Sequence, residues 1–220
     1  MATTNTNPEV STAVRLDRRA RRRRETIEEA LDLAEQIMTE QGVGGLTVTE
    51  MARRLGVQSP SLYKYFPSLH AVYDALFARG LARLDAALKE ALSSVPPSTE
   101  RFRVGLKAVV GWCVGHPALA QLMFWRAVPG FEPSPETFDA SVRQTEELRA
   151  NLAEAVRAGE LHPRADSDEA VRVLRVLISG LITQQMANQP GAEVESGLFT
   201  SLTDELVDMF LAHYDPHGGS

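Results

Sequence analysis

The sequence predicts an all-α protein of roughly nine helices. Apolar residues recur at steps of three and four along most of the chain, and Gly- or Pro-containing breaks separate these periodic stretches. No stretch alternates apolar and polar residues over the length of a strand. With 220 residues, of which 44% are hydrophobic, the chain is long enough for a small domain joined to a larger one.

The N-terminal region divides into a tail and a first helix. Residues 1–14 are rich in Thr, Asn and Ser, and arginines crowd positions 15–24. We therefore expect residues 1–20 to form a disordered basic tail. From Glu25 to Gln41 the apolar residues fall on one helical stripe, and a glycine-rich segment then ends the helix.

The next segment has the pattern of two short helices joined by a tight turn. Thr47 and Glu50 have the spacing of a capping box, in which each side chain satisfies a free backbone N–H at a helix start. Gly56 is placed to end this helix in the left-handed conformation. Ser59 is expected to cap the second helix, which extends to Phe66. The inward-facing residues are apolar: Val48, Met51, Ala52, Leu55, Leu62 and Phe66.

Two short helices joined in this way form a helix-turn-helix, and we assign residues 21–67 to a three-helix domain of this kind. Residues 68–215 are expected to form the larger helical domain. Its expected helices lie at about residues 68–92, 100–115, 117–127, 135–158, 167–189 and 195–214.

Composition limits the class of protein. The net charge is −6, but residues 1–66 carry a net +1 and residues 67–220 a net −7, so the acidic total does not exclude binding to a phosphate backbone. No apolar run reaches the length of about 18 residues that a membrane span needs, and we expect a cytoplasmic protein. Cys113 is the single cysteine, expected as a buried small hydrophobe. No metal-ligand spacing or phosphate loop occurs, so we expect no metal and no cofactor.

The segment from Arg24 to Leu76 resembles the TetR/AcrR family of bacterial repressors. The match rests on the stretches "TIEEALDLAEQIMTEQG", "LTVTEMARRLGV" and "SPSLYKYF", followed by a helix that begins near Ser68. The resemblance implies a homodimer whose two recognition helices enter successive major grooves of a palindromic operator in double-stranded DNA. It also implies a small-molecule effector pocket in the larger domain that controls DNA affinity.

Short and amide side chains on the second helix can reach base edges, and hydroxyl and ammonium groups at its end can donate to phosphates. The resemblance assigns Thr47, Tyr63 and Lys64 to the DNA backbone. The sequence departs from the family at Tyr65, where a histidine is common, and at Leu69, where many members carry a phosphate-binding lysine. The expected DNA contacts are Arg23, Arg24, Thr47, Gln58, Ser59, Pro60, Ser61, Tyr63, Lys64, Tyr65 and His70.

The arginine cluster before the first helix has two interpretations. A run of charges is usually solvated, and many disordered tails are basic. Immediately before a DNA-binding domain, such an arm can instead enter the minor groove or lie along phosphates. We favour contact with DNA.

The larger domain holds two candidate surfaces. Large apolar groups and one imidazole gather where they could line a cavity for an apolar or aromatic effector, or simply form the core. The expected effector contacts are Trp112, His116, Met123, Phe124, Trp125 and Phe138. The last two helices could pack as a four-helix dimer interface, or could complete the core of one chain. The expected dimer contacts are Leu174, Leu177, Ile178, Leu181, Leu202, Leu206 and Phe210.

Three functions remain open at this point. The leading one is a transcriptional repressor released from its operator by the effector. The second is a ligand-independent architectural DNA-binding protein. An enzyme is the third: His116, Cys113 and Asp139 are suitable residue types, but no motif fixes their geometry, so we do not expect an enzyme.

Overall fold

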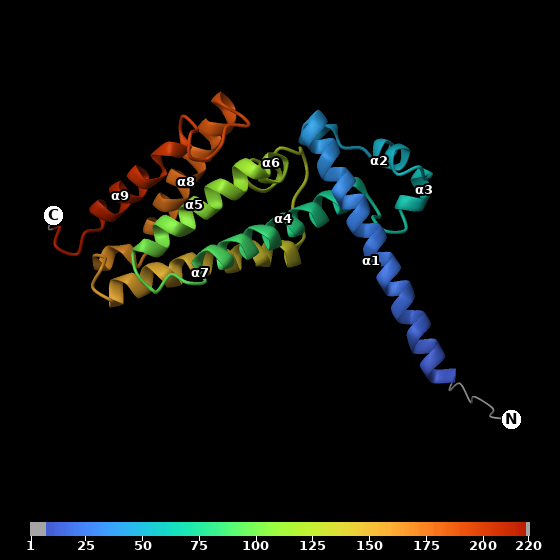
Figure 1. Ribbon diagram of the computed structural model, residues 1–220, viewed down its shortest axis with the longest axis horizontal. Coiled ribbons are helices and arrows are strands. Elements are labelled where there is room, and N and C mark those ends of the chain that lie inside the picture. The colour runs from blue at the N-terminus through green and yellow to red at the C-terminus, as the bar shows by residue number, and fades with distance from the viewer. Residues whose placement is uncertain (1–7, 219–220) are drawn as a thin grey trace. The chain divides into compact units, whose positions relative to one another are not determined.

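The computed structural model describes residues 8–218, with side chains from residue 18 onward (Figure 1). The described residues are helical apart from their connections and include no strand, as predicted. Three 3-10 turns, η1 (Val43–Gly45), η2 (Pro163–Ala165) and η3 (Thr200–Leu202), supplement the α-helices. These are α1 (Pro8–Gln41), α2 (Val48–Arg54), α3 (Ser59–Leu62), α4 (Leu69–Leu92), α5 (Glu100–Gly115), α6 (Pro117–Phe124), α7 (Pro135–Arg157), α8 (Asp168–Asn188) and α9 (Thr203–His213).

The first helix is longer than predicted. α1 begins at Pro8 and not near Glu25, so residues 8–20 are helical where a disordered tail was expected. The remainder of that predicted tail, residues 1–7, lies outside the described residues. Arg and Ala are good helix formers, and the exposure of Arg18, Arg19 and Ala20 does not prevent a helix that continues from a packed one.

The chain divides into two compact units, residues 1–72 and 73–220, whereas the sequence placed the boundary between residues 67 and 68. The core of the smaller unit is built by the apolar stripe of α1 and the inward faces of α2 and α3. Its buried members are Ala30, Leu31, Ala34, Ile37, Met38, Val43, Leu46, Met51, Ala52, Leu62, Phe66 and Val72. This core holds the helix-turn-helix segment in place.

In the larger unit α5 is the central helix, in contact with α6, α8 and α9. Its buried residues include Leu106, Val110 and Cys113. Cys113 is completely buried, as expected of a small core hydrophobe, and burial raises the pKa of its thiol to about 12. None of the described helices is both long and apolar enough to cross a membrane.

The last predicted helix, residues 195–214, is shorter in the structure. α9 begins at Thr203, and buried Gln185 explains the difference. Its Oε1 accepts hydrogen bonds from the backbone N–H groups of Phe199, at 2.9 Å, and Thr200, at 3.2 Å. A side chain of α8 thereby takes backbone donors that a helix would have used, an interaction between residues 14 and 15 positions apart that periodicity does not reveal.

Candidate functional site

The helix-turn-helix begins with a cap on α2. The Thr47 hydroxyl accepts a hydrogen bond from the backbone N–H of Glu50 at 3.1 Å, as predicted. The second half of the predicted capping box is wrong, because the Glu50 carboxylate turns to two arginines of its own helix. It accepts from Arg53 at 2.8 and 2.7 Å and from Arg54 at 2.7 Å.

These ion pairs join α2 to α1. Arg53 and then Arg54 hold the pKa of Glu50 well below its usual 4.5, at about 2. Arg54 also reaches Glu40 near the end of α1, at 2.7 Å, and that hydrogen bond lowers the pKa of Glu40. The cluster of Glu40, Glu50, Arg53 and Arg54 therefore ties the first helix of the motif to the helix beneath it.

Gly56 forms the turn between α2 and α3. Its φ of +68° is left-handed, as predicted, and the N–H of Val57 donates to the carbonyl of Ala52 at 3.0 Å. The N–H of Gly56 donates to the carbonyl of Arg53 at 3.3 Å, so the two hydrogen bonds together make a Schellman motif. Glycine is required here for its backbone conformation, since a Cβ would meet nothing within 4 Å.

The second helix of the motif is short. α3 covers Ser59–Leu62 instead of the predicted Ser59–Phe66, and its N-cap is Gln58 and not Ser59. The N–H groups of Tyr65 and Phe66 both donate to the Leu62 carbonyl at 2.9 Å, so the chain closes in a turn. Pro67 keeps this turn from continuing as a helix, because a proline disfavours helical conformation in the residue before it.

In the α3 segment the large apolar side chains are buried and the polar ones are exposed or half-buried. Leu62 and Phe66 are buried at 3% and 5% exposure, as predicted. Tyr63, at 51% exposure, and Lys64 face solvent. The remaining predicted contacts are exposed at Gln58 and Pro60 and half-buried at Ser59, Ser61 and Tyr65. A small apolar core thus presents amide, hydroxyl and ammonium groups on one short surface.

Arg23 joins this surface from α1. Its guanidinium donates to the Lys64 carbonyl at 3.3 Å and lies 5.2 Å from the centre of the Tyr65 ring. The next predicted contact, Arg24, is exposed and projects about 100° away around the helix. Thr47 and His70, the two other predicted contacts, are exposed at the starts of α2 and α4. The structure therefore brings Arg23 to Lys64, 41 positions away in sequence.

The predicted effector residues of α5 and α6 form local contacts. Trp112 is buried and stacks on His116, with ring centres 4.8 Å apart and planes 15° apart. The His116 Nδ1 lies 2.9 Å from the Trp112 carbonyl. Trp125 donates its indole N–H to the Thr183 hydroxyl at 2.9 Å, which ties the end of α6 to α8. Trp112 is therefore a core residue, whereas His116 and Trp125 are half-buried.

The other three predicted effector residues do not converge on a cavity either. Met123 packs directly on Gly80 of α4, where a Cβ would collide with its sulfur. Phe124 and Phe138 are exposed at 42% and 55%. None of the six predicted residues lines the cavity of about 380 Å³ that lies between α4 and α7.

Seven of the eleven residues that line this cavity are charged or polar. Asp85 and Lys89 form an ion pair at 2.8 Å, and Gln144 donates to the Leu81 carbonyl at 3.1 Å. The lining consists of Ala78, Leu81, Ala82, Asp85, Lys89, Glu136, Thr137, Ala140, Arg143, Gln144 and Glu147.

The predicted dimer residues divide between core and surface. Leu174, Leu181 and Phe210 are buried in the single chain, at 4%, 5% and 2% exposure, so they have no apolar surface left to offer a second chain. Leu177, Ile178 and Leu206 are half-buried, and Leu202 is exposed. Val176 and Met209, which are not among the expected dimer contacts, lie on α8 and α9 at 69% and 59% exposure.

Two family models match the sequence. The model described as "Bacterial regulatory proteins, tetR family" matches residues 30–76, which contain α2 and α3. The model described as "Tetracyclin repressor-like, C-terminal domain" matches residues 102–210. The chain belongs to the TetR family.

Relatives of this TetR-family chain match along most of its length. The nucleoid occlusion factor SlmA of Edwardsiella ictaluri is 24% identical over 185 residues, which cover 80% of this chain and 91% of that protein. A protein of unknown function from Rhodococcus sp. RHA1 has a TM-score of 0.72 and 25% identity, covering 86% and 95% of the two chains. The TetR-family regulator PfmR of Thermus thermophilus shares the fold, with a TM-score of 0.60 at 22% identity, covering 83% and 97%. The chain is accordingly a DNA-binding transcriptional regulator of this family.

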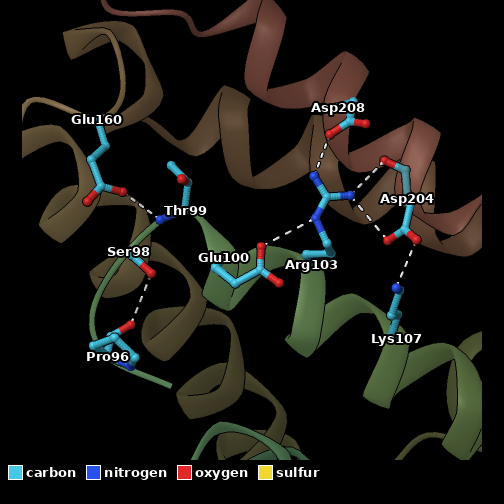
Figure 2. Close-up of polar contacts among 9 residues, drawn as sticks. All are labelled: Pro96, Ser98, Thr99, Glu100, Arg103, Lys107, Glu160, Asp204 and Asp208. Carbon is cyan, nitrogen blue, oxygen red and sulfur yellow. Dashed lines mark hydrogen bonds and ion pairs between the residues drawn. The ribbon is translucent and has the colours of Figure 1, made fainter. Parts of the chain in front are cut away.

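The larger unit contains an ion-pair cluster that was not predicted from the sequence (Figure 2). Arg103 of α5 reaches Asp204 of α9 at 3.1 Å and also pairs with Asp208, and Lys107 reaches Asp204 at 2.8 Å. Both carboxylates raise the pKa of Arg103, and Lys107 and then Arg103 lower that of Asp204. The sequence does show two like charges four positions apart on each of α5 and α9. It does not show that these charges pair with one another across about 100 positions.

Proposed function

We propose that the protein is a dimeric repressor that binds a palindromic operator and is released by a small molecule. The observation that carries the proposal is the polar surface of residues 58–64, mounted on buried Leu62 and Phe66 within the segment that the family model matches. Gln58, Ser59 and Ser61 would contact base edges, while Tyr63 and Lys64 would contact phosphates.

The test of this surface is to select bound sites from a random-sequence duplex library with the purified protein. We expect a palindromic site with half-site centres about 34 Å apart. Substitution of Ser59 or Ser61 by Ala should change the preferred bases, whereas Tyr63→Phe should weaken binding to all sequences. Recovery of no preferred sequence would contradict the proposal.

The dimer would form through exposed apolar groups of α8 and α9. Val176, Leu202 and Met209 supply exposed apolar area, and Gly180 has open space where a second backbone could approach closely. We expect Val176→Asp to yield a monomer in light scattering at micromolar concentration. The matched control is Val142→Asp on α7, where an apolar residue is 38% exposed outside this surface. Equal behaviour of the two variants would overturn the α8–α9 interface.

The effector would bind in the cavity between α4 and α7. A volume of about 380 Å³ is enough for a small molecule, and its lining favours a polar, charged compound over the apolar or aromatic one that the sequence suggested. Free amino acids, which carry both charges, are the first probes. A compound that raises the melting temperature and weakens operator binding is expected to lose both effects in Arg143→Ala and to keep them in Arg126→Ala, which is outside the cavity.

A ligand-independent regulator is the second candidate. The observation in its favour is that none of the six residues expected to hold an effector lines the cavity between α4 and α7. Operator affinity that no compound changes, in a protein that still selects a palindromic site, would support it.

A further inference from the structure

We propose that the N-terminal half of α1 is a helical basic arm that lies along the phosphates of DNA flanking the operator. The proposal rests on the proposed function, because it needs a protein that binds duplex DNA. It adds a second contact with DNA outside the polar surface of residues 58–64, which is called the recognition surface below. This second contact is made by charged groups and is independent of the base sequence.

The arm is defined by residues 18–24, and its arginines are all exposed. No acidic residue stands among these seven positions, and α1 continues past them to Pro8. Figure 1 shows this end of α1 extending past α2 and α3, within the same compact unit. The exposed arginines are Arg18, Arg19, Arg21, Arg22, Arg23 and Arg24.

This concentration of charge has a cost within the protein. Arginines three and four positions apart lie side by side on a helix and repel one another. The Arg21–Glu25 pair, at 3.5 Å and with both side chains about two-thirds exposed, offsets little of that repulsion. A polyanion along the helix would relieve it. Ala20 is the only apolar residue among positions 18–24, so the arm has no apolar face for a lipid surface, and duplex DNA is the partner that fits.

Arg23 identifies which face of the arm meets the DNA. Its contacts with Lys64 and Tyr65 place it beside the phosphate-binding end of the recognition surface. Helical geometry places Arg19 and Arg22 with Arg23 within an arc of about 100°, and Arg21 and Arg24 on the opposite side. The face of Arg19, Arg22 and Arg23 is therefore continuous with the recognition surface.

The length of the arm sets its reach. Within the arm, from Arg23 to Arg18, the helix rises roughly 7.5 Å, which corresponds to about two base pairs of duplex. The contacts would fall on phosphates beyond the bases read by α3, and their contribution would be electrostatic and independent of sequence.

The test compares two double variants on two duplexes. Arg19→Ala/Arg22→Ala removes the proposed face, and Arg21→Ala/Arg24→Ala removes the same charge from the opposite face. The duplexes carry the selected site either trimmed to its ends or with roughly ten extra base pairs on each side, which exceeds the reach of the arm. Wild-type protein should bind the flanked duplex more tightly.

The first variant should lose that advantage, and its log–log salt slope on the flanked duplex should fall by about 0.9 for each phosphate contact removed. On the trimmed duplex it should match the wild type, and thermal unfolding should be unchanged because both side chains are exposed. The second variant should keep most of the advantage.

Two results would overturn the arm: equal binding of both duplexes by the wild type, or equal losses in the two variants, which would show that charge alone matters and not the face. Failure of the wild type to retain any duplex would instead contradict the proposed function.

Discussion

The two compact units differ in where their stabilising contacts come from. In the helix-turn-helix of the smaller unit the cap of α2 is made by a local contact, the hydrogen bond between Thr47 and Glu50, three positions apart. In the larger unit Arg103 and Asp204 pair across 101 positions, and Trp125 and Thr183 across 58. The recognition surface is therefore encoded in one short stretch, whereas the larger unit depends on contacts that only the fold creates.

The largest expected effect concerns the small core. Phe66→Ala should reduce the free energy of unfolding of the smaller unit by about 3–5 kcal/mol and abolish DNA binding, because it empties a buried site beneath α3. Phe138→Ala, at an exposed site of the larger unit, should change the free energy of unfolding of that unit by less than about 0.5 kcal/mol. Urea denaturation followed by circular dichroism measures both; similar losses would erase the distinction between core and surface.

The turn of the motif gives the next largest effect. Gly56→Ala forces a Cβ into a left-handed conformation and should cost about 1–2 kcal/mol. Gly44→Ala is the matched control, since Gly44 has no positive φ and open space around it. The same denaturation experiment checks this, and a neutral Gly56→Ala would mean that the turn adopts another geometry in solution.

The long-range contact of the larger unit should contribute less. Arg103→Ala breaks ion pairs with three carboxylates. Because the Arg103 side chain is 23% exposed and Asp208 is mostly solvated, we expect the free energy of unfolding to fall by only about 1 kcal/mol. The loss should shrink in high salt. Thermal unfolding at low and high NaCl, with exposed Arg172→Ala as the control, measures it. A salt-independent loss would point to packing by the Arg103 stem.

The smallest effect is the pH dependence of the α1–α2 junction. The pKa of Glu50 is lowered from 4.5 to about 2, so its stabilising contribution is complete above pH 4.5 and is lost as the pH falls toward 2. Glu50→Gln should therefore flatten the acid limb of the stability curve of the smaller unit. Far-UV circular dichroism between pH 5 and about 2 measures this. An unchanged acid limb would show that Glu50 is not paired in solution.

The sequence predicted the parts of the molecule whose cause is local. The cap at Thr47, the turn at Gly56 and the inward-facing Leu62 and Phe66 all follow from short-range chemistry. None of the predicted effector residues lines the cavity between α4 and α7, because hydrophobicity alone does not separate a core residue such as Trp112 from a cavity wall.

Several other differences arise from tertiary contacts. Gln185 shortens the last helix by binding backbone N–H groups of the segment before it, and Arg23 reaches Lys64 from a helix whose start lay within the expected tail. The buried position of Leu174, Leu181 and Phe210 depends on packing within one chain. Helical periodicity indicates that a face is apolar, but not which chain covers it.

Residues 58–64 form the proposed DNA-contacting surface, and the decisive experiment is the salt dependence of DNA binding by Lys64→Ala. Affinity for the selected duplex is measured over a series of NaCl concentrations, with Lys107→Ala as a control of equal charge change in the larger unit. We expect Lys64→Ala to weaken binding to every sequence and to lower the slope of log affinity against log salt concentration by about 1. Lys107→Ala should leave this slope unchanged. A slope that Lys64→Ala leaves untouched would contradict this assignment.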